Sequence, residues 1–273
     1  MKKQTINING HEIAYLDNEN NALPILFVHG NSLSSDTFEF QFSDKQLNQN
    51  YRLIAPDLPG HGDSGRADKP EDVYTIQAFF GLIVDFIRAM NIKEAVFAGH
   101  SLGGHILMEA YDQIRELSKG LVLFGAPPIM IPIRMELSHY ENPAFELAFT
   151  EKLSEDEFQV LAESMIKPGG MVPDIIYKSI RNSHGMMRPI LVSSTTPEKL
   201  KNEAEVVKNI KEPVAVFHGR EDQMLKLSYY EHLEIPSLWQ SRAIPIENSG
   251  HCPQLENPEE FNSLLVEFIK DKA

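Results

Sequence analysis

The chain has 273 residues, 42% of them hydrophobic and 23% charged, which is the composition of a soluble globular domain and not of a disordered segment. The formal net charge of -14 argues against nucleic acid and anionic membrane surfaces as partners, because both attract clustered Lys and Arg. Cys252 is the only cysteine, so no intrachain disulfide can form, and a disulfide-stabilised secreted scaffold is excluded.

The N-terminal residues do not have the pattern of an export signal. Lys2 and Lys3 resemble the charged start of a signal peptide, but residues 4–15 supply polar side chains where an apolar stretch would have to follow. The longest stretches without Asp, Glu, Lys or Arg contain Gly, Pro or His and are too short to span a bilayer. We therefore expect a cytoplasmic protein.

Short β-rich runs recur along the chain, and most of the later ones are continuously apolar. They cover residues 5–9, 12–16, 25–28, 52–55, 95–98, 121–124, 214–217 and 243–246. Apolar runs separated by helix-length segments indicate parallel strands covered by helices on both faces, whereas Asn9-Gly10 between the first two runs predicts an antiparallel hairpin. The sequence therefore predicts an α/β fold with about eight strands in a mixed, mainly parallel sheet.

Two of the predicted helices have clear sequence signals. Residues 76–90 carry an apolar stripe at helical spacing, formed by Ile76, Phe79, Phe80, Ile83, Phe86, Ile87 and Met90. The last helix is expected to begin after Asn257, which can cap its N-terminus, with Pro258 at the first helical position and Glu260 at the capping-box position. Both helices are predicted to pack on the sheet.

The strand pattern stops between residues 126 and 197. Segments 144–149, 155–165 and 174–181 have helical patterns between Pro and Gly breaks, so we expect residues 126–197 to form an inserted helical cap, with residues 1–125 and 198–273 as the core. Six of the ten methionines lie in this insertion: Met130, Met135, Met165, Met171, Met186 and Met187. Because methionine suits adaptable apolar surfaces, they are consistent with an acyl-chain pocket and equally with ordinary packing of the cap.

A nucleophile-elbow pattern follows the run at residues 95–98. Gly99-His100-Ser101-Leu102-Gly103 matches G-x-S-x-G, and apolar residues at helical spacing follow it. In such a strand–turn–helix unit the serine occupies a strained turn, and glycines on either side remove Cβ atoms that would clash with the neighbouring strand and helix. Ser101 is therefore predicted to be a nucleophile. The alternative is a glycine-rich turn that carries an incidental serine.

A serine hydroxyl needs a base, and ten histidines are candidates. His251 has the most suitable position, because it follows the last predicted strand and precedes the last helix, at the sheet edge where ligands gather in open α/β folds. His11, His139, His184 and His232 have no comparable position, and His100 lies within the elbow. We predict that His251 is the general base; a structural loop histidine is the alternative.

The acid that orients the histidine is expected between Ser101 and His251. The loop after residues 121–124 contains no carboxylate, whereas the loop after residues 214–217 offers Glu221 and Asp222. Either carboxylate would fix the imidazole tautomer and stabilise the imidazolium as it forms.

The tetrahedral intermediate of such a reaction needs backbone donors for its oxyanion. One predicted donor is the N–H of Leu102, and the other is the N–H of Asn31 in the loop after residues 25–28. The Asn31 side chain is predicted either to add a contact or to stabilise its loop through an Asx-type turn.

Five motifs in this order make the chain resemble the α/β-hydrolase superfamily along nearly its whole length. They are His29-Gly30-Asn31-Ser32, the run from Asp57 to Ser64, the elbow, Gly219 to Asp222, and Gly250-His251. The phrases His-Gly-Asn-Ser, Ala-Pro-Asp-Leu-Pro-Gly-His-Gly and Ser-Leu-Gly-Gly-His are most similar to the capped esterase-like members that include N-acyl-homoserine lactonases.

The resemblance implies an α/β-hydrolase fold with a helical cap, and its spacing of Gly, two residues and Asp favours Asp222 over Glu221. It implies a serine hydrolase that cleaves a small-molecule carboxylic ester or lactone through an acyl-enzyme, an N-acyl-homoserine lactone among the candidates, without a cofactor. A carboxylesterase, a thioesterase, a C–C hydrolase, a cofactor-free perhydrolase and a non-catalytic ligand-binding homologue are alternatives on the same residues.

Other chemistry has weaker support in the sequence. The histidines show no H-E-x-x-H arrangement, so we expect no metal site. Dehalogenases and epoxide hydrolases of the superfamily that this chain resembles place an aspartate at the elbow, so Ser101 argues against both. Cys252 is predicted to be a small buried or loop residue and not a nucleophile.

Overall fold

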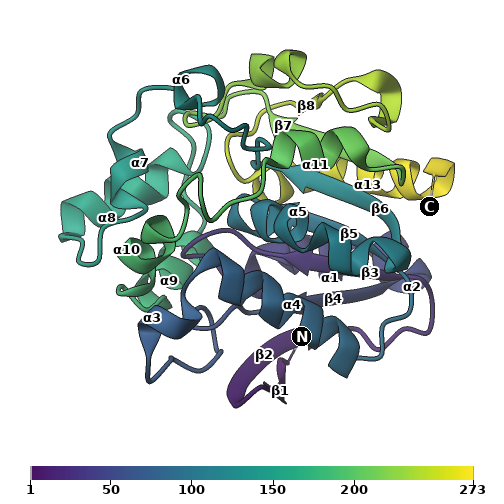
Figure 1. Cartoon of the computed structure of the whole chain (residues 1–273), viewed down its shortest axis with the longest axis horizontal. Helices are drawn as coiled ribbons and strands as arrows, with labels where there is room; N and C mark the ends of the chain where they lie inside the picture. The colour runs from purple at the N-terminus through teal and green to yellow at the C-terminus, as the bar shows by residue number, and fades with distance from the viewer. Residues whose placement is uncertain (1, 273) are drawn as a thin grey trace.

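A single eight-stranded sheet forms the centre of the computed structural model, which describes residues 2–272 (Figure 1). The strands are β1 (Gln4–Ile8), β2 (His11–Asp17), β3 (Pro24–Val28), β4 (Arg52–Pro56), β5 (Ala95–His100), β6 (Ser118–Phe124), β7 (Val214–Gly219) and β8 (Ile244–Ile246). They are arranged in the order β1-β2-β4-β3-β5-β6-β7-β8. All eight predicted strands are present, which confirms the α/β-hydrolase fold class.

The sheet is mixed, as predicted. The β1–β2 and β2–β4 pairs are antiparallel, and every pair from β3–β4 to β7–β8 is parallel. Asn9 and Gly10 connect β1 to β2 with positive φ values of 54° and 89°, the backbone that a tight hairpin turn requires. The parallel strands end at one edge of the sheet, and the loops that follow them can bring distant residues together there.

Alternate residues of each strand point to opposite faces of the sheet. Both faces carry apolar side chains, and helices cover both. Helices α4 (Ile76–Ala89), α5 (Leu102–Ile114) and α11 (Glu203–Asn209) share one hydrophobic cluster with the strands, whereas α1 (Glu39–Ser43), α2 (Lys45–Asn50) and α13 (Pro258–Lys272) share the other. The remaining short helices of the core are α3 (Pro70–Val73), α12 (Pro253–Glu256), η1 (Ser35–Phe38), η2 (Arg115–Leu117), η3 (Leu227–His232) and η4 (Trp239–Ser241). Within residues 2–272 no helix is both long enough and apolar enough to cross a membrane.

The N-terminus of α13 differs in detail from the predicted capping box. The Asn257 side chain accepts a long hydrogen bond of 3.4 Å from the Glu260 N–H, as an N-cap does. The Glu260 carboxylate instead accepts hydrogen bonds from the Asn257 side-chain amide and from the Glu247 N–H. The reciprocal half of the box is absent because the Asn257 N–H donates to Pro253 in the preceding turn.

Five helices lie between β6 and α11, within residues 126–197, which we call the helical segment. They are α6 (Met135–Ser138), α7 (Ala144–Leu147), α8 (Glu155–Ser164), α9 (Asp174–Asn182) and α10 (Met187–Ser193). Figure 1 shows them gathered to one side of the sheet. Residues of α8 and α9 form a third hydrophobic cluster with Leu33, Met224 and Cys252, which lie in the loops after β3, β7 and β8. The helical segment thus packs on the loops that follow the parallel strands.

Candidate active site

Ser101 occupies the sharp turn between β5 and α5. Its backbone has φ 50° and ψ -119°, a left-handed conformation that L-residues rarely adopt and that costs roughly 1–3 kcal/mol. The Ser101 N–H donates to the Phe124 carbonyl at 2.9 Å, which ties the turn to β6. The neighbouring strand therefore holds the serine in a strained position.

Glycines at the elbow let the strand and helix approach as closely as the motif predicts. A Cβ on Gly103 would lie 2.0 Å from the Val28 carbonyl oxygen, and a Cβ on Gly99 would lie 2.5 Å from the Cα of Gly104. A Cβ on Gly104 itself would lie 2.4 Å from the Ala126 Cβ. None of these distances allows a larger residue without movement of the backbone.

The structure brings His251 and Asp222 together from the loops after β8 and β7. The His251 Nδ1 donates to the Asp222 Oδ2 at 2.9 Å, while the Asp222 Oδ1 accepts from the N–H groups of Met224 and Leu225 at 2.8 and 3.0 Å. Burial opposes the charge on Asp222, but the adjacent His251 ring lowers the pKa of the carboxyl below its usual value. The Glu221 side chain is exposed, so of the two carboxylates in this loop it is Asp222, the one that the resemblance favours, that bonds to His251.

The His251 loop is fixed by hydrogen bonds that the sequence did not reveal. The Glu256 carboxylate accepts from the N–H groups of Gly250 and Cys252 at 2.8 and 3.3 Å, and burial raises its pKa to about 7. The buried His100 ring donates through Nε2 to the His251 carbonyl at 2.8 Å. Hydrogen bonds therefore fix the residues before and after His251 as well as the backbone carbonyl of His251 itself.

Asn31 lies in the loop after β3 and lines the same cavity as Ser101. Among the described residues, neither the Asn31 N–H nor the Leu102 N–H has a backbone or side-chain acceptor. The Asn31 side-chain amide donates to the Ala148 carbonyl at 2.8 Å, and its oxygen accepts from the Ser32 hydroxyl at 3.1 Å. The Asx-turn interpretation is therefore wrong, because this side chain connects its loop to the helical segment.

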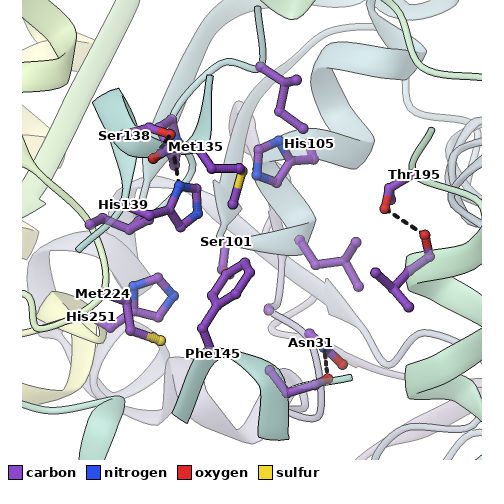
Figure 2. Close-up of a pocket in the computed structure, with 18 of the residues that line it drawn as sticks. Asn31, Ser101, His105, Met135, Ser138, His139, Phe145, Thr195, Met224 and His251 are labelled. Carbon is purple, nitrogen blue, oxygen red and sulfur yellow. Dashed lines mark hydrogen bonds between the residues drawn. The ribbon is translucent and has the colours of Figure 1, made fainter. Parts of the chain in front are cut away.

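Ser101 and His251 line a cavity of about 360 Å³ between the strand ends and the helical segment (Figure 2). Most of its wall is apolar, with side chains that include Leu33, Phe145, Phe149, Leu161, Leu191 and Leu200. Three of the six predicted methionines, Met130, Met135 and Met165, line it, joined by Met224 from the loop after β7. Met171 and Met186 are instead exposed, and Met187 is buried without lining the cavity.

His105 and His139 line the cavity as well, as does His100, and neither His105 nor His139 was identified as a site residue from the sequence. His105 donates through Nδ1 to the buried Glu203 carboxylate at 2.8 Å. His139 shares a hydrogen bond of 2.7 Å with Ser138, and burial lowers its pKa to about 4. The position of His105, four residues after Ser101 in the predicted helix, was a usable signal. Nothing local to His139 indicated that it would reach the site.

The other motif histidines have structural contacts. His29 donates through Nδ1 to the Gly30 carbonyl at 2.8 Å and accepts from the Leu58 N–H at 3.0 Å, while His61 donates to the Pro59 carbonyl at 3.1 Å. Across residues 2–272, no group of three or more His, Cys, Asp or Glu side chains is arranged to hold a metal ion. Cys252 is a buried free thiol, and burial raises its pKa.

Solved structures of an N-acyl homoserine lactonase are similar to this chain over almost its full length. A glutamate-to-glycine variant of the lactonase AidH, complexed with N-hexanoyl homoserine, has a TM-score of 0.92 and 29% identity, and the match covers 100% of this chain and 97% of that one. A serine-to-glycine variant, complexed with N-hexanoyl homoserine lactone, has a TM-score of 0.92 and 28% identity over 99% of this chain and 98% of that one.

Sequence comparison gives a broader set of relatives. The AB hydrolase superfamily protein YisY of Bacillus subtilis (strain 168) is 26% identical over 267 residues, which cover 94% of this chain and 96% of that protein. A 2-hydroxy-6-oxo-6-(2'-aminophenyl)hexa-2,4-dienoic acid hydrolase of Metapseudomonas resinovorans is 24% identical over 273 residues, covering 98% and 91%. The model of the alpha/beta hydrolase family matches residues 25–264. The chain therefore belongs to the alpha/beta hydrolase family.

Proposed function

We propose that this hydrolase is a serine enzyme that cleaves carboxylic esters or lactones through an acyl-enzyme. The observation that carries the proposal is the position of Ser101 in a strained elbow at an apolar cavity, which it shares with a His251 ring bonded to Asp222. Serine, histidine and a carboxylate supplied by separate loops in this chain order form the triad used by serine hydrolases of this fold.

The reaction would proceed in two steps. Ser101 Oγ attacks the scissile carbonyl carbon while the His251 Nε2 takes its proton, and the tetrahedral intermediate then expels an alkoxide that receives this proton. Water repeats the sequence on the acyl-enzyme and releases the acid. Asp222 keeps the proton of a neutral His251 ring on Nδ1, which leaves Nε2 free to accept the proton of Ser101.

The oxyanion of each intermediate needs donors that are already in place. The N–H groups of Asn31, in the loop after β3, and of Leu102, at the start of α5, have no acceptor among the described residues, and they suit this role. Since the side chain of Asn31 is anchored to Ala148, the position of its loop depends on the helical segment.

We propose that the helical segment, residues 126–197, is a cap that supplies the acyl-binding wall of the cavity. Its contribution of Phe145, Phe149 and three methionines supports binding of a flexible alkyl chain. Medium-chain N-acyl-homoserine lactones are our leading substrates, because the two AidH variants were solved with N-hexanoyl homoserine and its lactone.

A substrate panel tests this proposal. Wild-type protein is assayed with N-butanoyl and N-hexanoyl homoserine lactones, p-nitrophenyl butyrate, an acyl thioester and a 2-hydroxy-6-oxohexa-2,4-dienoate. We expect lactone opening with the highest kcat/KM on an acyl lactone. A preference for short simple esters without lactone opening would contradict the lactonase assignment, and cleavage of the dienoate alone would indicate a C–C hydrolase.

A further inference from the structure

A second histidine–carboxylate pair faces the cavity next to the proposed nucleophile. Ser101 is the N-cap of α5, and His105 lies one turn into that helix, where its N–H bonds to the Ser101 carbonyl at 3.3 Å. The His105 side chain is 19% exposed and lines the cavity together with Ser101. Figure 2 shows the His105 ring beside Met135, reaching into the space above Ser101.

Glu203 fixes the orientation of this ring. Its carboxylate is completely buried, accepts from the His105 Nδ1 at 2.8 and 3.1 Å, and also accepts from the Ile129 N–H at 2.8 Å. With Nδ1 engaged in this way, Nε2 is the remaining nitrogen, and no described residue bonds to it. Glu203 thus holds a ring whose unused nitrogen is available to a bound molecule.

The His105–Glu203 pair also supplies a hydrogen-bond donor where the rest of the wall is mostly apolar. Burial alone would lower the pKa of His105, but the charges of Glu203 and, more weakly, Glu109 raise it above its usual value. When the ring carries protons on both nitrogens, Nε2 is a donor while Nδ1 stays bonded to Glu203. Because Glu203 neutralises the imidazolium charge, the pair attracts a polar neutral group more readily than a free anion.

We propose that His105, held by Glu203, forms a hydrogen-bonding subsite for a neutral carbonyl oxygen near the scissile bond, such as the amide oxygen of an N-acyl lactone. This proposal rests on the proposed function and specifies its substrate class. It gives a role to a histidine on α5, the helix that begins at Ser101, and to its buried partner Glu203 on α11, at a cavity whose wall is mostly apolar.

The test compares two lactones that differ only at the amide. N-Hexanoyl homoserine lactone carries the carbonyl, and α-heptyl-γ-butyrolactone replaces the amide with methylenes. The readout is the ratio of their kcat/KM values, because this ratio cancels any loss of correctly folded protein. His105→Asn keeps a group that can bond to Glu203 but removes Nε2, the nitrogen that Glu203 does not engage, whereas His105→Gln extends its amide towards the position of Nε2.

We expect His105→Asn to lower the ratio by about 10- to 100-fold, the loss associated with a hydrogen bond to a charged group, and His105→Gln to restore most of it. The exposed His232, outside the cavity, supplies the control: His232→Asn should leave the ratio unchanged. If His105→Asn lowers kcat/KM equally on both lactones, or on neither, the ratio stays unchanged and the subsite is overturned.

A binding measurement separates this proposal from the proposed function. In the Ser101→Ala background, calorimetry should show tighter binding of the amide-bearing lactone, and adding His105→Asn should abolish the difference between the two lactones. If wild-type protein hydrolyses no ester or lactone, the proposed function fails while calorimetry still decides the subsite. Equal affinity of the two lactones with His105 present contradicts the subsite, whatever the turnover.

Discussion

Arg188 of α10 donates a hydrogen bond of 2.9 Å from its Nε to the hydroxyl of Ser32, the residue that follows Asn31. The guanidinium is buried and also donates to the Ile180 carbonyl and the Ser183 hydroxyl at 3.2 and 3.0 Å. No carboxylate among residues 2–272 forms an ion pair with it, and burial lowers its pKa. A desolvated cation thus joins the helical segment to the loop of the proposed oxyanion donor.

Replacing this arginine should destabilise the protein and disturb that loop. Arg188→Leu leaves the Ser32 hydroxyl and several carbonyls without a donor, so we expect the free energy of unfolding to fall by roughly 2–4 kcal/mol. Urea denaturation at pH 7 measures this change. The exposed Arg115, whose one ion pair within residues 2–272 is with Glu116, is the control, and Arg115→Gln should change stability by less than about 0.5 kcal/mol. Equal effects of the two substitutions would show that the buried network contributes nothing.

Two glycine-to-alanine substitutions distinguish a glycine required by close packing from one that only adds flexibility to a helix. Gly103→Ala places a methyl group 2.0 Å from the Val28 carbonyl, so we expect a loss of more than about 3 kcal/mol or failure to fold. Gly81 lies inside α4 and has nothing within 4 Å of its Cβ position, so Gly81→Ala should stabilise the protein by about 0.5–1 kcal/mol. Thermal unfolding of both variants checks the contrast, and a well-folded Gly103→Ala protein would contradict the described elbow.

The strands and the positions of the elbow, Asp222 and His251 could be predicted because their signals are local. Buried parallel strands are apolar runs bounded by turn residues, and the loops that carry candidate catalytic residues follow these strands directly. The cavity wall could not be predicted in this way. His139 follows the four-residue helix α6, too short to show a period, and His105 pairs with a glutamate 98 positions away. An arginine such as Arg188 is expected at the surface from the sequence alone, whereas in the structure its side chain is buried within the helical segment.

Asp222 and Glu221 can be distinguished by activity. Asp222→Asn presents an amide to His251 and favours the wrong tautomer, so we expect kcat to fall by roughly 10²- to 10⁴-fold, less than for a change at Ser101 or His251. Glu221→Gln alters an exposed side chain, and kcat should stay within about twofold of wild type. Steady-state kinetics on the best ester of the panel provides both values. The reverse order of effects would assign the acid to Glu221.

The His105–Glu203 pair should make stability depend on pH. Because the pKa of His105 is raised in the folded protein, its contribution is fully present below the unfolded value of about 6.5 and is lost as pH rises through the folded value. The stability advantage of wild type over His105→Asn should therefore be greatest near pH 6 and decline towards pH 9. Urea denaturation across this range measures it, and a constant difference between the two proteins would contradict the raised pKa.

The central claim is that Ser101 is the nucleophile, and the most direct test is covalent labelling with a fluorophosphonate followed by peptide mapping. Wild-type protein should gain one phosphonyl group on the peptide that contains Ser101, at a rate that His251→Ala reduces strongly. Ser101→Ala protein, which keeps the His251–Asp222 pair, should gain none. Labelling at another residue, or equal labelling of the Ser101→Ala variant, would contradict the proposed mechanism.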